Sequence, residues 1–236
     1  MKRWFGAGLA GAALIWAALY LAWTIPGPDS PVTADRPDAV TLMNFAPPFS
    51  LSPLPPGWLH RTFWFRRPMQ MRLTRVDGHD ALECDTDAGG SILMRSADID
   101  IRRFSRLSWF WRVDQPVSSP LDETTPAGDD HPLRFFLAFA DAGGGKHAAE
   151  IIWANRAYKR GDWKVIDGFT HYVADGGPEA PLATWRAETA DLAAIYRRAT
   201  GRNDAARLTG IGIMCDSDDT GGQTRAYVGG PVVLNP

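Results

Sequence analysis

The sequence has no excess of basic residues. Its 236 residues include 25 Lys and Arg against 27 Asp and Glu. Lys2 and Arg3 are the only charged residues among the first 25, so the rest of the chain carries 23 basic and 27 acidic residues and a formal charge of −4. Nucleic acids and anionic lipid surfaces are bound through clustered Lys and Arg, so this balance argues against both as partners.

The sequence also lacks the local motifs of a nucleophilic enzyme. No Ser or Cys stands in a Gly-x-Ser-x-Gly nucleophile elbow. His171 has Asp167 and Asp175 nearby and could form a dyad with either, but a single His on a strand is more often a half-buried polar residue. We therefore assign no catalytic residues from the sequence.

Cysteine is scarce. Cys84 and Cys215 are the only two, and each lies on an expected strand. An oxidising compartment would permit a disulfide between them. Buried free cysteine on a core face explains each residue equally well, so both alternatives stay open.

Charge is absent from residues 4–25, an apolar run of 22 residues that follows Lys2 and Arg3. As a helix this run would span roughly 33 Å, close to the hydrocarbon thickness of a bilayer. The preceding positive charges put the N terminus in the cytoplasm and the body outside it. Bulky residues at 19–23 leave no good cleavage site, so we expect residues 1–25 to be an uncleaved transmembrane anchor; a signal peptide is the alternative.

Proline is concentrated in residues 26–56, which hold nine of the 18 prolines of the chain. Proline fixes φ and removes a hydrogen-bond donor, so we expect a semi-extended, Pro-rich linker rather than a packed segment. It would hold the body away from the membrane, or lie along its own domain or a partner. Residues 57–236 are then the extracytoplasmic domain, large enough for one core.

Alternation of apolar and polar residues dominates this domain. Leu107, Trp109, Trp111 and Val113 share one face of an expected strand. Similar short runs recur along the domain, separated by Gly, Pro, Asp and Asn clusters. This pattern predicts a mainly β fold, an antiparallel two-sheet sandwich or a barrel, rather than a parallel α/β fold.

One segment has helical spacing instead. Residues 184–199 carry apolar side chains at intervals of three and four, with charged residues elsewhere. Thr184 can cap the start of this helix and Gly201 can stop it. We expect one principal helix here, covering one end of the sandwich.

The last two expected strands flank an acidic turn. Residues 211–215 alternate as a strand with one buried face, and residues 226–234 form the closing strand. We expect the two strands and the turn between them to form one hairpin-like unit. Asp216, at the end of the first strand, should be partly buried and therefore paired, hydrogen-bonded or metal-bound.

The aspartates of this turn are candidate calcium ligands, namely Asp216, Asp218 and Asp219. Asp216, Asp218 and Thr220 occupy positions one, three and five of a calcium-loop pattern, but position twelve is Tyr227 and not the Glu of an EF-hand. A structural Ca²⁺ would need further ligands, such as Asp129 or Asp130. The alternative is that these carboxylates bind turn amides and arginines.

The candidate ligand-binding residues are Trp153, Asn155, Trp163, Asp129 and Asp130. Indole rings stack on the faces of sugar rings. Trp153 with Asn155, and Trp163 beside Asp162 and Lys164, are expected at an exposed cleft. Asp129 and Asp130 are adjacent carboxylates, which can raise a pKa for general acid work but more often cap a turn.

Several segments together resemble a bacterial family, the domain of unknown function 3047. They are Gly57-Trp58, the strand from Leu107 to Asp114, Ala127 to Asp130, Ile152 to Asn155, Tyr196-Arg197-Arg198 and the closing MCDSDDTGG…AYVGG. The resemblance covers nearly all of residues 57–236 and brings no assigned activity. It implies an exported β-sandwich similar to jelly-roll carbohydrate-binding modules. With the anchor expected at residues 1–25, we expect this domain in the periplasm, attached to the inner membrane.

Three functions follow as hypotheses. The first is a membrane-anchored, non-catalytic module that binds a glycan or another cell-envelope ligand. The second is an accessory subunit of a membrane complex, which packs through its single transmembrane helix and covers the periplasmic side. The third is a hydrolase of envelope carbohydrate, which the missing nucleophile disfavours.

Overall fold

The structure, a computed structural model, describes residues 29–236. The expected transmembrane anchor or signal peptide at residues 1–25 lies outside this range. Within the described range no helix is long and apolar enough to cross a membrane.

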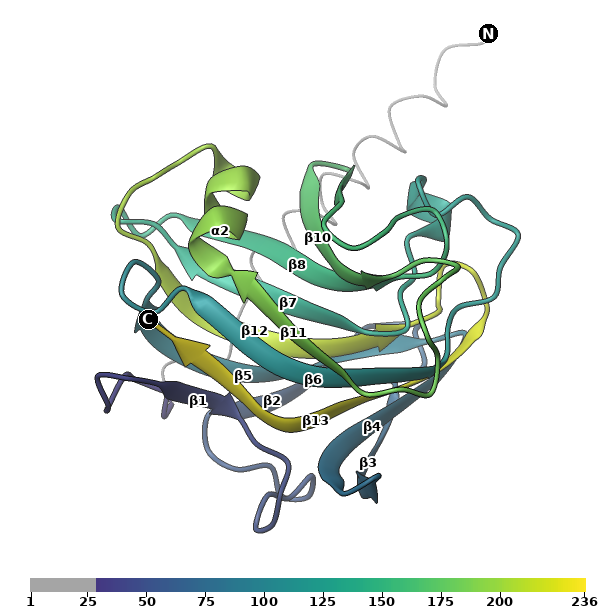
Figure 1. The fold of residues 1–236 in the computed structure, drawn as a ribbon, viewed down its shortest axis with the longest axis horizontal. Coiled ribbons are helices and arrows are strands. Elements are labelled where there is room, and N and C mark those ends of the chain that lie inside the picture. Colours follow the sequence, from purple (N-terminus) through teal and green to yellow (C-terminus); the bar gives the residue numbers. More distant parts are fainter. Residues whose placement is uncertain (1–28) are drawn as a thin grey trace, which may run out of the picture.

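Two β-sheets pack face to face as a sandwich, and the mainly β prediction is confirmed (Figure 1). The six-stranded sheet contains β1 (Val40–Met43), β3 (Gln70–Val76), β4 (His79–Asp87), β6 (Arg106–Gln115), β11 (Arg186–Asp191) and β13 (Gln223–Asn235). The seven-stranded sheet contains β2 (Trp58–Thr62), β5 (Gly90–Asp100), β7 (Arg134–Ala140), β8 (Lys146–Ala154), β9 (Trp163–Ile166), β10 (Phe169–Gly176) and β12 (Arg207–Asp216). A short 3-10 turn, η1 (Pro126–Gly128), precedes β7.

The strand orders are β11-β6-β13-β4-β3, with β1 also on β13, and β2-β5-β12-β7-β8-β10-β9. The core lies between the sheets. On β6 the predicted face is buried: Leu107, Trp109, Trp111 and Val113 are each at most 2% exposed, whereas Phe110 on the other face is 37% exposed. Trp111 stacks on Phe135 of the opposite sheet, so alternation within each strand builds the core as expected.

One strand pair departs from the antiparallel prediction, because β8 and β10 run parallel. The chain leaves β8, forms the edge strand β9, and returns through Asp167 and Gly168, both at positive φ. This two-residue turn folds β10 back against β9 and into the place beside β8. Because the second strand of this hairpin lies next to β8, β8 and β10 pair in parallel.

The helix is shorter than predicted. Residues 186–191 form β11, antiparallel to β6, and the helix α2 spans Leu192–Thr200. Asp191, not Thr184, is its N-cap and accepts hydrogen bonds from the amides of Ala193 and Ala194. Gly201 ends it in the left-handed conformation, as predicted. Residues 186–191 pair with the edge of β6, and this pairing outweighs their helical spacing.

The hairpin-like unit is also corrected. β12 belongs to the seven-stranded sheet and β13 to the other, so the turn at residues 217–222 carries the chain from one sheet to the other. Figure 1 shows this turn, in yellow, at one end of the sandwich and α2 at the other. A disulfide joins Cys84 of β4 to Cys215 of β12, with a Cα–Cα distance of 6.3 Å.

The packed structure begins before Gly57. Residues 40–43 of the expected linker form β1, which pairs with the last strand, β13. Leu42, Met43 and Phe45 are each at most 2% exposed, and Phe49 packs against Trp58. Leu42, Met43, Phe45 and Phe49 are close in sequence and all pack in or against the core. This part of the Pro-rich segment therefore lies along its own domain.

The disulfide should contribute strongly to stability, because it links the sheets across a separation of 131 residues. Reduction should lower the free energy of unfolding by about 2–4 kcal/mol. Denaturant titrations with and without a reductant measure this loss. The Cys84→Ala/Cys215→Ala variant should be equally destabilised and insensitive to reductant, whereas an unchanged wild-type midpoint in reductant would contradict the prediction.

Candidate functional site

A row of charged side chains lies on the face of the seven-stranded sheet that points away from the sandwich core. Lys164 of β9 is opposite His171 of β10, and His171 is opposite Glu150 of β8. The next residues in sequence, Ile151 and Tyr172, pack on the core side. Strand alternation and register therefore bring the three charged or polar side chains together across three strands.

Further along the sheet the same face is apolar. Ile92, Met94, Phe136 and Met214, from β5, β7 and β12, form a buried cluster of their own. Phe63, at the end of β2, packs against it. The outer face thus has a charged half and an apolar half, and Arg134 of β7 lies where they meet.

Arg134 is the centre of the charged half. Its side chain is 5% exposed, with Nη1 2.7 Å from Glu150 Oε2 and Nη2 2.7 Å from Asp216 Oδ2. Nη2 also donates to the carbonyl of Asp129 at 2.6 Å. Burial would lower the pKa of Arg134, but Asp216 and Glu150 raise it well above its usual value. The guanidinium is thus a fixed positive charge that ties three segments together.

Lys164 lies on the other side of Asp129. Its ammonium is fully buried, 2.5 Å from Asp129 Oδ1 and 3.1 Å from His131 Nε2. His171 Nε2 is 3.3 Å from Glu150 Oε2 and 3.8 Å from Asp129 Oδ2. The partners of His171 are therefore Glu150 and Asp129, and not the Asp167 or Asp175 suggested by sequence distance.

The contacts of His131 fix its tautomer. Nδ1 is 3.1 Å from the carbonyl of Trp153, which can only accept, so Nδ1 carries the proton. Nε2 is then free to accept from the Lys164 ammonium. Burial lowers the pKa of His131 to about 4, although the nearby Asp129 carboxylate opposes this effect. His131 is therefore neutral at pH 7.

The two acidic partners of these cations are ionised. Burial alone would raise the pKa of Asp129, but His131 and the charge of Arg134 hold it well below its usual range. Burial would also raise the pKa of Glu150, and the charge of Arg134 again lowers it. Carboxylates and cations therefore alternate within the cluster, in surroundings of low dielectric constant.

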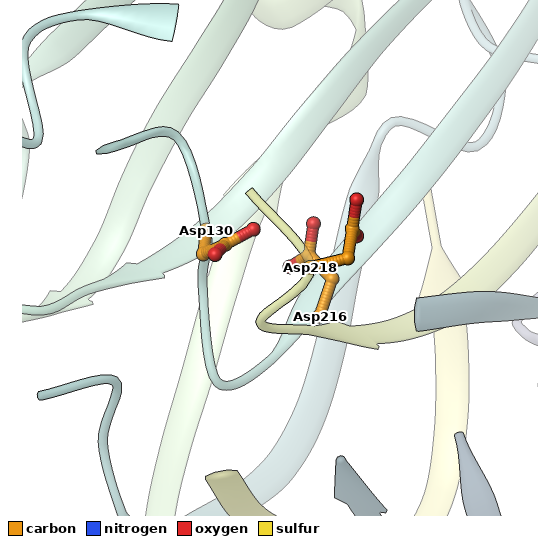
Figure 2. A group of neighbouring side chains, drawn as sticks. All are labelled: Asp130, Asp216 and Asp218. Carbon is orange, nitrogen blue, oxygen red and sulfur yellow. The ribbon is translucent and has the colours of Figure 1, made fainter. Parts of the chain in front are cut away.

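Three aspartates converge at the edge of this cluster (Figure 2). One carboxylate oxygen each of Asp130, Asp216 and Asp218 lie within 4.8 Å of one another. Asp130 accepts from the amides of Asp219 and Thr220 at 3.3 and 2.7 Å. Asp216 Oδ1 accepts from the amide of His131 at 3.0 Å. The prediction that Asp216 is buried and partnered is confirmed, at 3% exposure.

Burial raises the pKa of Asp216 to about 8. The positive charge of Arg134 lowers it, while the nearby Asp130 carboxylate raises it further. Asp216 is therefore largely protonated at neutral pH, whereas Glu150, on the same guanidinium, is ionised. The environment thus raises the pKa of one carboxyl group and lowers the pKa of the other.

The geometry changes the expected calcium ligands. Asp219 points away, with its side chain 40% exposed near Arg66, and Asp130 takes its place in the cluster. Asp218 is paired with Arg66 through Oδ2, while its buried Oδ1 has no hydrogen-bond partner. Turn amides and two arginines already serve most of these oxygens, so Ca²⁺ bound by Asp130, Asp216 and Asp218 stays a prediction.

The predicted ligand-binding residues separate into two groups. Asp129 and Asp130 lie in the cluster. Trp153 is 1% exposed and belongs to the core, so the expectation of an exposed cleft there is wrong. Asn155 braces the preceding loop, donating to the carbonyl of Asp130 and accepting from the amide of Val117.

Trp163 is half-buried and packs on the core side. Its ring contacts Tyr172 at 5.0 Å, and the Arg198 guanidinium of α2 lies 5.8 Å from its centroid. Trp163 thus holds α2 against β9 and β10. Its neighbour Lys164 faces the charged cluster instead, since successive strand residues point to opposite faces.

Three site residues were missed by the sequence reasoning: Arg134, Glu150 and Glu123. Glu150 stands in the run Ala148 to Ala154 of otherwise apolar residues. A charge in an apolar strand must find a partner, and that signal could have found it. Glu123 is 3% exposed and accepts from the amides of residues 155–157, which fixes the loop before Asp129.

The fold and the cluster together define a β-sandwich domain with a buried charged centre on the outer face of one sheet. The chain belongs to the family described as protein of unknown function DUF3047, whose model matches residues 56–232. The resemblance drawn from the sequence is confirmed. A search of curated proteins gives no match.

Solved structures give weak similarities. An agarase, AgWH50C, is 10% identical with a TM-score of 0.37, covering 84% of this chain and 25% of the agarase. The family 11 xylanase from Neocallimastix patriciarum is 9% identical with a TM-score of 0.29, covering 75% of this chain and 95% of the xylanase. The chain spans about a quarter of the agarase. Likeness at this level supports no argument about activity.

The two ends of the acidic turn should differ in their effect on stability. Asp216→Ala removes the acceptor that serves the buried Arg134 side chain and the amide of His131, and should cost about 1–3 kcal/mol of unfolding free energy. Asp219→Ala removes an exposed carboxylate and should change it by less than about 0.5 kcal/mol. Denaturant titration of both variants measures the contrast; equal small effects would contradict it.

Adding EDTA to the same samples tests the cation. If an ion is bound among these aspartates, the chelator lowers the melting temperature of the wild type and Ca²⁺ restores it. The Asp216→Ala variant should then not respond to either. If amides and arginines alone hold the turn, no sample responds.

Stability should fall as pH rises from about 6.5 to 8. The pKa of Asp216 is about 8 in the folded state and about 3.9 when unfolded, so the folded state binds more protons in that window. His131, with a folded pKa of about 4, has the opposite sign and offsets this below about pH 6.5. The slope should approach about 1.4 kcal/mol per pH unit and vanish in Asp216→Asn, measured by chemical denaturation at several pH values.

Proposed function

We propose that the protein is a β-sandwich binding module outside the cytoplasm, held to the inner membrane by residues 1–25. Its ligand would be a glycan or another hydroxyl-rich component of the cell envelope, bound at the charged cluster. The disulfide between Cys84 and Cys215 supports the compartment, because such bonds persist in oxidising surroundings.

The observation that carries the binding role is the set of buried polar atoms without hydrogen bonds. Four of the six such atoms in residues 29–236 belong to this cluster and its edge: Asp129 Oδ1, Arg134 Nε, His171 Nδ1 and Asp218 Oδ1. Asp129 Oδ1 has an ionic contact with Lys164 but no aligned hydrogen bond. Buried polar groups are almost always satisfied in proteins, so their concentration here supports a bound partner.

The character of these atoms indicates the chemistry of the partner. The carboxylate oxygens accept hydrogen bonds, Arg134 Nε donates one, and His171 Nδ1 can do either. A hydroxyl group both donates and accepts, so neighbouring sugar hydroxyls would serve such a mixed set. Asp129, with its side chain 18% exposed, is the member through which the cluster reaches the surface.

A hydrolase is the second candidate, and one observation favours it. Asp216, with a pKa of about 8, and Glu150, with a lowered pKa, share Arg134. Carboxyl groups whose environments separate their proton affinities are the pattern of an acid and base pair. Both side chains are buried against Arg134, so catalysis would require this pair to open.

Titration of the full chain in mild detergent with oligosaccharides tests the proposal. The probes are hexamers of β-1,4-glucose, β-1,4-xylose and N-acetylglucosamine, followed by calorimetry. At least one should bind, and His171→Gln should weaken it about fivefold by removing one polar contact. His147→Gln is the matched control. Like His171, His147 lies on a strand of this sheet, β8, and has an aspartate partner, but it lies away from the cluster.

Each result has a distinct meaning. Failure of all three probes to bind, or equal weakening by the two histidine variants, would contradict the proposed site. Release of reducing ends during the titration, lost in Glu150→Gln, would favour the hydrolase over the binding module.

A further inference from the structure

The two most exposed large apolar side chains in residues 29–236 are neighbours in one turn. Trp64 is 79% exposed and Phe65 is 96% exposed, against 58% for Val165, the next. Their rings meet edge to face, with centroids 5.4 Å apart. Single exposed apolar residues are ordinary, but an adjacent aromatic pair held out in solvent marks an interaction surface.

The backbone of this turn is unfavourable for its sequence. Phe65 has φ of 64°, in the left-handed region that bulky residues rarely adopt. Such a conformation persists only where the surroundings impose it, and it is found mainly at functional sites. The strain points both rings outward at a cost in stability, which a purely structural turn would avoid by having glycine there.

The base of the turn is fixed on both sides. The amide of Arg66 donates to the carbonyl of Phe63, and the amide of Gly90 donates to the carbonyl of Arg67. Phe63 packs against the apolar half of the outer face. The turn is therefore a rigid support for the two rings, so little conformational entropy would be lost on binding.

The turn borders the candidate site. Arg66 is paired with Asp218 of the aspartate cluster and lies 3.5 Å from Asp219. Asp130, the residue after Asp129, accepts a hydrogen bond from the amide of Thr220 and so holds the turn that carries these aspartates. The turn that presents the exposed rings is thus adjacent to Asp218, whose Oδ1 has unused hydrogen-bonding capacity.

We infer that Trp64 and Phe65 form an aromatic platform on which a sugar ring of the bound glycan stacks. A sugar ring has an apolar C–H face, which suits the electron-rich face of an indole, and a rim of hydroxyls, which suits the polar groups beside it. This inference rests on the proposed function and names the residues that would select its ligand.

Charge argues against a lipid surface as the occupant. The two cations of the turn are already neutralised, Arg66 by the aspartates and Arg67 by Asp87 at 3.1 Å. Binding to an anionic membrane surface relies on unpaired Lys and Arg beside the inserted aromatic residues. A neutral sugar ring makes no such demand.

The test uses the full chain in mild detergent and the same three hexasaccharides, with calorimetry. For the probe that binds best, Trp64→Ala should weaken binding at least about tenfold, and Trp64→Phe should recover much of it. Leu73→Ala is the matched control, since Leu73 is an exposed apolar residue on β3 of the other sheet, 37% exposed. The Leu73→Ala variant should bind the probe as tightly as the wild type does.

Phe65→Gly separates function from folding. Glycine adopts positive φ without strain, so this variant should melt at a higher temperature than the wild type. If Phe65 belongs to the platform, the same variant binds the probe more weakly. A role in stability alone would not give these opposite changes.

The outcomes are distinguishable. Binding by the wild type that Trp64→Ala leaves unchanged overturns the platform and leaves the proposed function standing. No binding of any probe overturns both. In vesicles of brominated phosphatidylcholine, quenching of indole fluorescence that is weaker in Trp64→Phe than in the wild type would place the turn in a bilayer and overturn the platform.

Discussion

A guanidinium cannot lose its proton inside a protein, so Arg134 must be neutralised where it lies. It is 5% exposed and reaches Glu150 on β8, Asp216 at the end of β12 and the carbonyl of Asp129 in the preceding loop. These contacts fix two strand ends and one loop relative to β7. Lys164 and His171 then contact Asp129 and Glu150. Removing the guanidinium would leave Glu150 and the carboxyl group of Asp216 buried without their shared partner.

Much of the fold could be predicted because one physical rule, alternation, acts within each strand. Trp109 and Trp111 on β6 were predicted to share one face of a strand, and that face lies in the core. The rule does not say which strands pair. Residues 186–191 have helical spacing, yet the free edge of β6 draws them into a strand. The path from β12 to the other sheet likewise depends on long-range pairing that no local pattern encodes.

The site was predictable only where its residues are close in sequence. Asp129, Asp130, Asp216 and Asp218 stood out as short acidic clusters, and the structure brings three of them together. The row from Lys164 to Glu150 was missed, because it runs across strands and arises from register. Trp153 was misplaced for a related reason: an aromatic residue at a strand end does not reveal which sheet face it occupies.

The loop before β7 has a consequence for how the family can vary in length. Glu123 holds the amides of residues 155–157, and His131 holds the carbonyl of Trp153, so both ends of the segment between them are clamped to the end of β8. Within it, Asp129 serves the charged cluster and Asp130 serves the acidic turn. One inserted or deleted residue after Glu123 would shift both carboxylates at once. Val117 and Leu121 are also tied to this strand end, through Asn155 and Arg156. Natural length variation should therefore be concentrated between these two residues, where it would shift neither carboxylate.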